Sequence, residues 1–167
     1  MLKIVFLDFD GVLLPDSQAF DQSQQGLTVH NYLETVIFDP KCVSQVNHII
    51  AQTQAQIVLS TSWARGHTFS QLCACLTRNH IDCSHIYEYE DPSLGDWRTP
   101  RTMSSDRARE ILLWLEDHPF VKQWCALDDQ LNIARLGKRA IVIDPQMGIG
   151  SSNAAHAINL LFKSEDQ

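Results

Sequence analysis

The sequence predicts an α/β fold: a doubly wound, mainly parallel sheet of five strands with helices on both faces. Short apolar runs alternate along the chain with segments in which apolar residues recur at helical spacing. The first of these runs is apolar on both faces, as strands are when a parallel sheet is covered on both sides. Alternation on this scale indicates parallel strands joined by helical crossovers. We expect a single domain over residues 1–167, which is long enough to bury a core without disulfides or structural metals.

The first part of the chain predicts a strand, a helix and a second strand. Residues 3–7 and residues 56–60 are the strand-like runs. Pro40 suits the first position of a helix, because its ring fixes a helical φ and its missing N–H is not needed there. The apolar residues on one face of this helix are Val43, Val46, Ile49 and Ile50. Together these elements form one βαβ unit.

The second part of the chain predicts three further strands. A short strand is expected around residues 85–89, another in the apolar run that begins at Trp124, and the last at residues 140–144. With the two earlier strands they complete a five-stranded sheet.

Three helices are expected between and after these strands. Apolar spacing over residues 69–76 predicts the first. Ser105 or Asp106 can cap the second, because a short polar side chain accepts hydrogen bonds from the free amides of a first helical turn. Its inward-facing residues are Ile111, Leu112, Trp114 and Leu115. Ser151 or Ser152 begins the last helix, which extends through Leu161.

Two carboxylates follow the first strand directly. Asp8 and Asp10 stand at its carboxyl end beside Gly11, which is where open α/β sheets bind ligands. This pair suits phosphoryl transfer: Asp8 attacks phosphorus as the nucleophile, and Asp10 protonates the leaving oxygen and then activates water. An anionic nucleophile approaching an anionic phosphate requires a cation between them, so further carboxylates are expected elsewhere.

Those carboxylates occur at Asp128 and Asp129, which end the apolar run from Trp124. Carboxylate oxygens are ligands that Mg²⁺ prefers. Asp128 is assigned a direct ligand role, and Asp129 either a second ligand role or the orientation of a metal-bound water. The same two acids can also cap a helix that begins near Gln130, and the two roles are compatible.

Hydroxyl groups follow the second strand at residues 60–62, where they and the backbone amides can bind phosphate oxygens. Counting apolar residues to the strand end favours Ser60 as the phosphate ligand. Matching the threonine-serine-tryptophan triplet to the family that this chain resembles, described next, favours Thr61, so both are candidates.

Taken together, these motifs resemble the four motifs of haloacid dehalogenase (HAD) phosphatases, in the expected order. More specifically, the chain resembles the small HAD domain of Swiss Army Knife RNA repair proteins, over Leu2 to roughly Leu161. The matching segments are DFDGV at 8–12, FDPKCV at 38–43, STSW at 60–63, TP at 99–100, RAREILLWL at 107–115 and LDD at 127–129. The resemblance implies a HAD-like Rossmannoid sheet.

The resemblance also implies roles for individual residues. Asp8 resembles the nucleophile, Asp10 the general acid and base whose backbone carbonyl is a further metal ligand, and Asp128 the magnesium carboxylate. Members with an acid at the position of Asp10 are generally phosphatases or phosphotransferases. Arg107, at the start of a helix, resembles the basic residue that holds nucleophile and phosphate together. The alternatives for that role are Arg101, Arg109 and Lys122.

Two segments and two single positions depart from the core pattern. Residues 13–38 are mostly polar and glutamine-rich after their first few positions, and the resemblance implies a flap or small cap there. Residues 89–105 form a long loop near the site, where Trp97 or Arg98 can contact substrate. Ala64 stands where relatives often have arginine, with Arg65 next, and Gln130 stands where a third acid is frequent.

Composition limits the class of partner. A net charge of −7 argues against a broadly basic nucleic-acid-binding face, so no stable nucleic-acid binding is expected. A local basic pocket of Arg65, His67, Arg98, Arg101 and Arg107 is still compatible with nucleotide ends as substrates. The five cysteines lack metal-ligand spacing and are expected as reduced core thiols. The chain has no signal-peptide pattern and no membrane-length apolar stretch, which predicts a cytoplasmic location without membrane association.

The function expected from the sequence is a Mg²⁺-dependent phosphomonoester hydrolase that forms an aspartyl-phosphate. Its substrate is expected to be a phosphorylated small molecule, a nucleotide or a nucleic-acid end. Two alternatives stay open: phosphotransfer to an acceptor other than water, and a regulatory module that binds phosphate without turnover.

Overall fold

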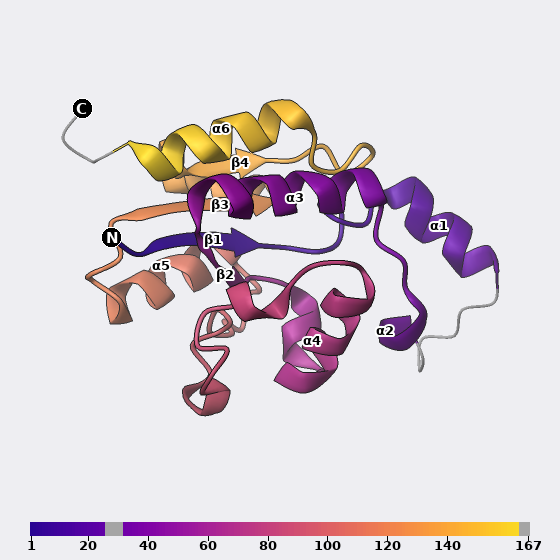
Figure 1. Ribbon diagram of the computed structural model, residues 1–167, viewed down its shortest axis with the longest axis horizontal. Coiled ribbons are helices and arrows are strands. Elements are labelled where there is room, and N and C mark those ends of the chain that lie inside the picture. Colours follow the sequence, from indigo (N-terminus) through magenta and orange to yellow (C-terminus); the bar gives the residue numbers. More distant parts are fainter. Residues whose placement is uncertain (26–31, 164–167) are drawn as a thin grey trace.

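The computed structural model describes residues 1–25 and 32–163, and these form one parallel sheet enclosed by helices (Figure 1). In order along the sheet, the strands are β2 (Gln56–Leu59), β1 (Lys3–Leu7), β3 (Gln123–Asp128) and β4 (Ala140–Val142). All neighbouring pairs are parallel. The chain first pairs β2 with one edge of β1 and then returns to pair β3 with the other edge. This confirms the α/β class and the parallel sheet.

The expected fifth strand is wrong, because residues 85–89 do not form a strand in the described structure. Ile86 makes a single bridge to Ile57, and the amide of Tyr87 donates to the carbonyl of Ile57 at 2.9 Å. Glu88 then has a φ of 57°, a left-handed conformation that no strand contains. The segment therefore contacts the edge of β2 at one point and turns away.

Helices cover both faces of the sheet. On one face, α3 (Pro40–Thr53) and α6 (Ser151–Phe162) lie side by side (Figure 1). They pack on the strand residues Val5, Leu7, Ile57, Leu59, Cys125 and Leu127. On the other face, α5 (Arg107–Asp117) packs on Ile4, Phe6, Val58 and Ala126. Since alternate strand residues point to opposite faces, both sets are buried, and the buried strand predicted from the run at residues 3–7 is confirmed.

The predicted helix starts agree with the observed ones. Asp39 caps α3, with Pro40 in its first turn, and Asp106 caps α5 by accepting from the amide of Arg109 at 3.2 Å. The helix expected over residues 69–76 is α4 (Phe69–Arg78), which packs against the short α2 (Tyr32–Thr35). Four of the five cysteines are buried, as expected for core thiols.

The predicted insertion at residues 13–38 contains α1 (Asp16–Gln24) and α2, which lie beyond the carboxyl ends of the strands (Figure 1). Residues 26–31 of that insertion are outside the described residues. The remaining short elements are 3₁₀ helices: η2 (Ser62–Arg65), η3 (Cys83–His85), η4 (Pro92–Leu94) and η5 (Leu131–Arg139). None of the helices in the described ranges has the length and apolar character needed to cross a membrane.

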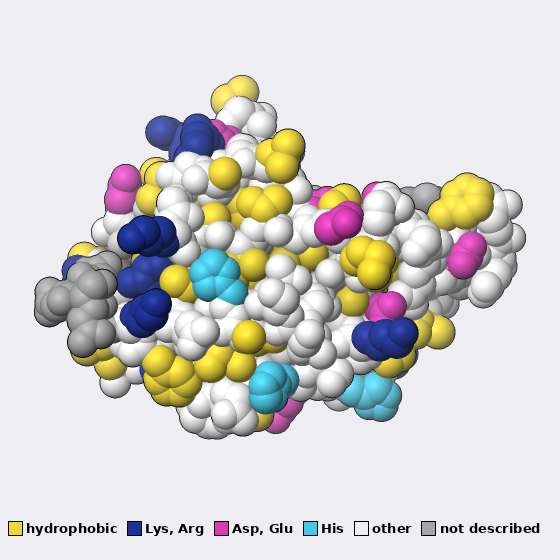
Figure 2. Space-filling model, turned by 90° about the horizontal axis from the view of Figure 1, so that it is seen from above, with side chains coloured by type: hydrophobic (Ala, Val, Ile, Leu, Met, Phe, Trp, Pro, Cys, Tyr) yellow, Lys and Arg dark blue, Asp and Glu magenta, His cyan; other side chains and the backbone are white. Residues whose placement is uncertain are grey.

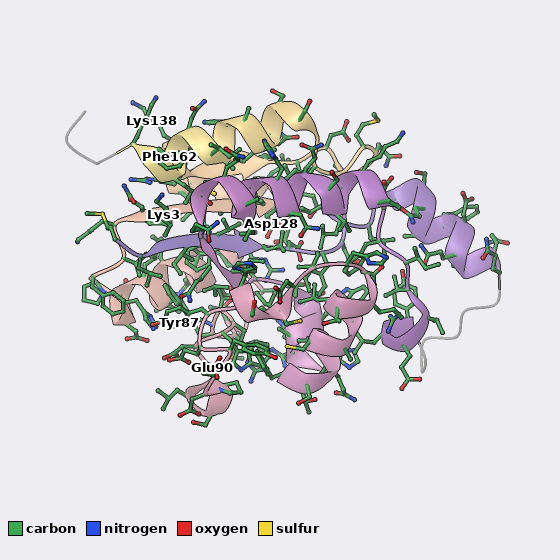
Figure 3. The ribbon with its side chains drawn as sticks, in the orientation of Figure 1. Lys3, Tyr87, Glu90, Asp128, Lys138 and Phe162 are labelled. Atoms are coloured by element: carbon green, nitrogen blue, oxygen red, sulfur yellow. The ribbon has the colours of Figure 1, made fainter. Side chains whose placement is uncertain are left out.

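Positive charge is unevenly distributed over the surface. Figure 2 shows one face, on which Lys and Arg side chains gather mainly toward the end where the chain termini lie. Lys3 and Lys138 mark that end of the sheet in Figure 3, away from α1. Over the described part of this face there is no continuous basic surface, in agreement with the net charge of −7.

Phe6 tests the packing between the sheet and α5. Its ring is fully buried and meets Trp114 and Trp124 edge-on, with centroid distances of 5.3 and 5.9 Å. Phe6→Ala should lower the free energy of unfolding by about 3–5 kcal/mol, because it removes buried apolar contact and leaves a cavity. Phe20→Ala is the control, since Phe20 is 64% exposed and should change stability by no more than about 0.5 kcal/mol. Similar losses for both variants in denaturant titrations would contradict the packing described.

Candidate active site

Strand register brings the polar strand ends together. Leu7 at the end of β1 pairs with Leu127 on one side and Leu59 on the other. The next residue, Asp8, donates its backbone N–H to the carbonyl of Leu127 at 3.1 Å, and Ser60 donates its own to the carbonyl of Leu7 at 2.9 Å. The carboxyl ends of three strands therefore meet at one edge of the sheet.

Three carboxylates converge at this edge. Asp8, Asp128 and Asp129 each place a carboxylate oxygen within 4.8 Å of the other two. Asp8 and Asp128 are buried, and Asp129 is half-buried. In Figure 3, Asp128 lies toward the α1 end of the sheet relative to Lys3 and Phe162. The side chain of Asp10 is outside this group. The metal-ligand role expected for Asp10 is that of its backbone carbonyl, which the position of the side chain does not affect.

Gly11 allows the chain to turn close to the carboxylates. It has a φ of 70°, and a Cβ atom built at this position would lie 2.6 Å from Oδ2 of Asp129. Glycine therefore provides both the left-handed conformation and the space that Asp129 occupies.

The environment of the carboxylates raises their pKa values. Burial is the largest cause of the raised pKa of Asp8, the negative charge of Asp128 adds to it, and Arg107 acts in the opposite direction. Burial likewise raises the pKa of Asp128 to about 6, against the opposing charge of Arg107. Burial thus outweighs the stabilising charge of Arg107 on both carboxylates.

Arg107 is the cation at the centre of this group. Its side chain is 3% exposed, and its Nε donates to Oδ2 of Asp128 at 2.8 Å. One terminal nitrogen donates to Glu110 at 3.0 Å, and the other lies 3.8 Å from Oδ1 of Asp8. The structure therefore brings Arg107 to the acids.

The alternative cations have different positions. Arg101, Arg109 and Lys122 are exposed on the surface, and Arg101 lines a cavity that Arg107 also lines. None of the three has an ion pair with Asp8 or Asp128 in the described structure. Arg107 is accordingly the basic residue that fits the expected role.

Glu110 is a site residue to which the sequence argument gave no role. Its carboxylate is 1% exposed and accepts from Arg107 through one oxygen and from Arg65 through the other, at 2.6 Å. The second oxygen also accepts from the amide of Thr102 at 3.0 Å and from its hydroxyl at 3.1 Å. Glu110 thus fixes the guanidinium of Arg107. The three-residue spacing of Arg107 and Glu110 on a helix was the signal that could have revealed this pair.

Asp10 occupies a different environment from Asp8. Its side chain is exposed at the edge of the site, and its Oδ2 accepts from Nε1 of Trp63 at 2.8 Å. The surrounding protein raises the pKa of Asp10 through desolvation, while the Trp63 hydrogen bond acts in the opposite direction. A raised pKa favours the protonated form that a general acid needs. Trp63 is the second site residue to which the sequence argument gave no separate role.

The two candidate hydroxyls also differ in setting. Ser60 Oγ is buried and has no hydrogen-bond partner within the described part of the chain. Thr61 Oγ1 accepts from the amide of Trp63 at 3.4 Å, and Thr61 lines the same cavity as Arg107. Each hydroxyl therefore retains a proton that it can donate to a ligand.

A cavity of about 350 Å³ adjoins Arg107. Four of the five residues of the expected basic pocket line it, namely Arg65, Arg98, Arg101 and Arg107. His67 lines a different hollow. Trp97 does not fit the expected substrate contact, because it is 4% exposed and packs on Phe69 with a centroid distance of 5.2 Å. The loop at residues 89–105 lines this cavity over Leu94, Gly95, Asp96 and residues 98–101, so Arg98 has the position expected for a substrate contact.

The fold and site define the class of protein. A parallel α/β sheet with clustered aspartates at the carboxyl ends of its strands is the arrangement expected for a HAD-superfamily protein. Residues 4–154 match the family described as the HAD domain in Swiss Army Knife RNA repair proteins, and the chain belongs to this family. Comparisons with curated proteins and with solved structures give no significant match. Membership of this family supports a phosphatase-type function.

Gly11→Ala tests the close approach of the turn to Asp129. The substitution should cost about 1–2 kcal/mol of stability for the left-handed conformation. It should cost roughly 1–3 kcal/mol more because Asp129 must move away from the new methyl group. Both effects are measured by denaturant unfolding.

Gly95→Ala is the matched control. Gly95 also has a positive φ, 85°, but a Cβ atom there would meet nothing within 4 Å. It should show only the conformational cost, and equal losses for the two variants would contradict the contact with Asp129.

Proposed function

We propose that this chain is a Mg²⁺-dependent phosphomonoester hydrolase that acts through a phosphoryl group carried on Asp8. The observation that supports this most directly is the convergence of Asp8, Asp128 and Asp129 within 4.8 Å, beside the buried Arg107. A group of this kind offers a carboxylate that can attack phosphorus and a guanidinium that can bind a phosphate oxygen, and a metal ion would add further positive charge.

The donor set fits a magnesium ion. Three carboxylates offer hard oxygen ligands close together. Their pKa values are raised chiefly by burial, which disfavours unpaired negative charge, so a bound cation would stabilise their ionised forms. Asp8, Asp128, Asp129 and the backbone carbonyl of Asp10 would hold the ion. When bound, it would neutralise the phosphate and reduce its repulsion by Asp8.

The chain's own residues perform the transfer in two steps. In the first, a carboxylate oxygen of Asp8 bonds to phosphorus as the bond to the leaving oxygen breaks, and Asp10 donates a proton to that oxygen. In the second, Asp10 takes a proton from water as the water oxygen bonds to phosphorus and the Asp8–phosphorus bond breaks. The exposed position of Asp10 gives it access to both the leaving group and water.

Arg107 and the strand-end hydroxyls bind the phosphate oxygens in this proposal. Arg107 is held by Glu110, so its guanidinium is oriented before the substrate arrives. Thr61 lines the adjoining cavity, and Ser60 has a hydroxyl still in need of a partner. The four arginines that line this cavity outnumber the three acids that also line it, Asp96, Glu110 and Asp117. The excess of positive charge suits substrates with additional negative charge, such as nucleotides or nucleic-acid ends.

Asp8→Asn tests the nucleophile. It should reduce Mg²⁺-dependent hydrolysis of an aryl phosphate to below about one-thousandth of the wild-type rate, because an amide cannot replace the attacking carboxylate. Asp21→Asn removes an exposed acid of α1 and should leave the rate unchanged. In Asp10→Asn, an acid quench should reveal one phosphoryl group on the peptide that contains Asp8. Wild-type turnover in Asp8→Asn would refute the assignment.

The same assay separates the alternatives. Phosphate release in water indicates a hydrolase, whereas phosphorylated products formed from added alcohols or nucleosides indicate a phosphotransferase. Stoichiometric phosphate binding with no turnover of any ester would indicate the regulatory module instead.

Magnesium binding should depend on pH. The folded pKa values of Asp8 and Asp128 are raised, so without metal these groups reduce stability as pH rises from the unfolded value near 4 through the folded value, about 6 for Asp128. Mg²⁺ requires the ionised carboxylates. Millimolar Mg²⁺ should therefore raise the melting temperature by several degrees at about pH 7.5 and by much less at about pH 5. An equal rise at both pH values, or none beyond that given by NaCl of equal ionic strength, would argue against this metal site.

A further inference from the structure

A second hollow, of about 390 Å³, lies between α1, α2 and η2. Its apolar lining comes from Ala19, Tyr32, Leu33 and Trp63, and we call it the Trp63 pocket. Its volume falls in the range of about 300–1,000 Å³ that is usual for small-molecule sites. It shares no lining residue with the arginine-lined cavity.

Trp63 connects this pocket to the general acid. Its indole N–H is hydrogen-bonded to Asp10, and its ring packs against Tyr32 with a centroid distance of 5.4 Å. The ring also meets Phe9 edge-on at 5.5 Å, which fixes its position. Trp63 therefore lines the pocket and is hydrogen-bonded to Asp10.

The reaction chemistry assigns different parts of the substrate to the two hollows. Asp10 gives its proton to the leaving oxygen, so the leaving group must lie on the side of Asp10. Arg107 lies on the side of the arginine-lined cavity, which suits the phosphate and any further anionic groups. An apolar surface with aromatic faces favours a planar ring over a small hydrated alcohol.

We propose that the Trp63 pocket binds the leaving group, and that the preferred substrates are phosphomonoesters of ring-bearing alcohols. This inference rests on the proposed phosphatase function and names its substrate class. Two kinds of substrate share this chemistry, because the alcohol that leaves carries a planar ring in both. In an aryl phosphate the ring bears the ester oxygen directly, and in a nucleoside monophosphate the sugar joins the ring to it.

Filling the pocket tests the proposal. Ala19→Trp adds a ring from α1 without replacing any proposed catalytic residue, and Ser23→Trp adds one from an exposed position at the pocket lining. For 1-naphthyl phosphate, kcat/KM should fall by about tenfold in each, the size expected for losing one ring stack. For glycerol phosphate it should stay within about twofold. Adenosine 5′-monophosphate, assayed in parallel, should follow 1-naphthyl phosphate if the natural ring is a nucleobase and glycerol phosphate if it is not.

Leu94→Trp is the matched control. Leu94 is 76% exposed and lines the arginine-lined cavity, so the same bulk is added on the other side of the site. It should leave the ratio of the 1-naphthyl and glycerol phosphate rates unchanged. Thermal melting of each variant shows whether a rate loss reflects unfolding.

A binding measurement separates the pocket from catalysis. In the Asp8→Asn background with Mg²⁺, calorimetry should show that Ala19→Trp weakens 1-naphthyl phosphate about tenfold and leaves inorganic phosphate unaffected. Equal weakening of both ligands, or of neither, would overturn the pocket assignment. If turnover depends on Asp8 but the pocket variants leave the ratio of the 1-naphthyl and glycerol phosphate rates unchanged, this inference alone is overturned. Turnover that persists in Asp8→Asn would instead overturn the proposed function.

Discussion

The buried guanidinium of Arg107 is the interaction on which the site depends. It pairs with Asp128 and Glu110 and approaches Asp8, all of them carboxylates removed from water. Burying several negative charges at one sheet edge is costly unless a cation accompanies them. Arg107 also begins α5, which packs beneath the sheet. The same helix therefore supports the core and supplies the buried positive charge of the site.

The buried carboxylates of the site carry more negative charge than Arg107 alone can balance. Burial keeps the pKa values of Asp8 and Asp128 raised in spite of the opposing charge of Arg107. This is the environment in which a divalent cation binds favourably. Asp10 stands apart, exposed and held by Trp63, so two acids only two residues apart have different environments. In the proposed mechanism, this difference lets one carboxylate bond to phosphorus and the other carry protons.

Most of the architecture could be predicted because strand ends and helix starts leave local signals. These signals depend only on neighbouring residues: a buried apolar run, Pro40 at a helix start and a cap at Asp106. The structure has the predicted strand or helix at each of them. The strand expected at residues 85–89 was wrong because pairing is not local. The positive φ of Glu88 turns the chain away after one bridge, so the described sheet has four strands. Trp97 likewise looked like a ligand contact but is part of the core.

The sequence by itself determined the candidate site groups: acids directly after buried strands, a turn glycine beside them, and an arginine at a helix start. Their order along the chain and the parallel fold were enough to place them at one edge. Only the tertiary structure decided that Glu110 fixes Arg107 and that Trp63 holds Asp10. It also decided that Arg107 lines one hollow and Trp63 another. These features depend on distances between segments far apart in the chain, which packing sets and local patterns do not encode.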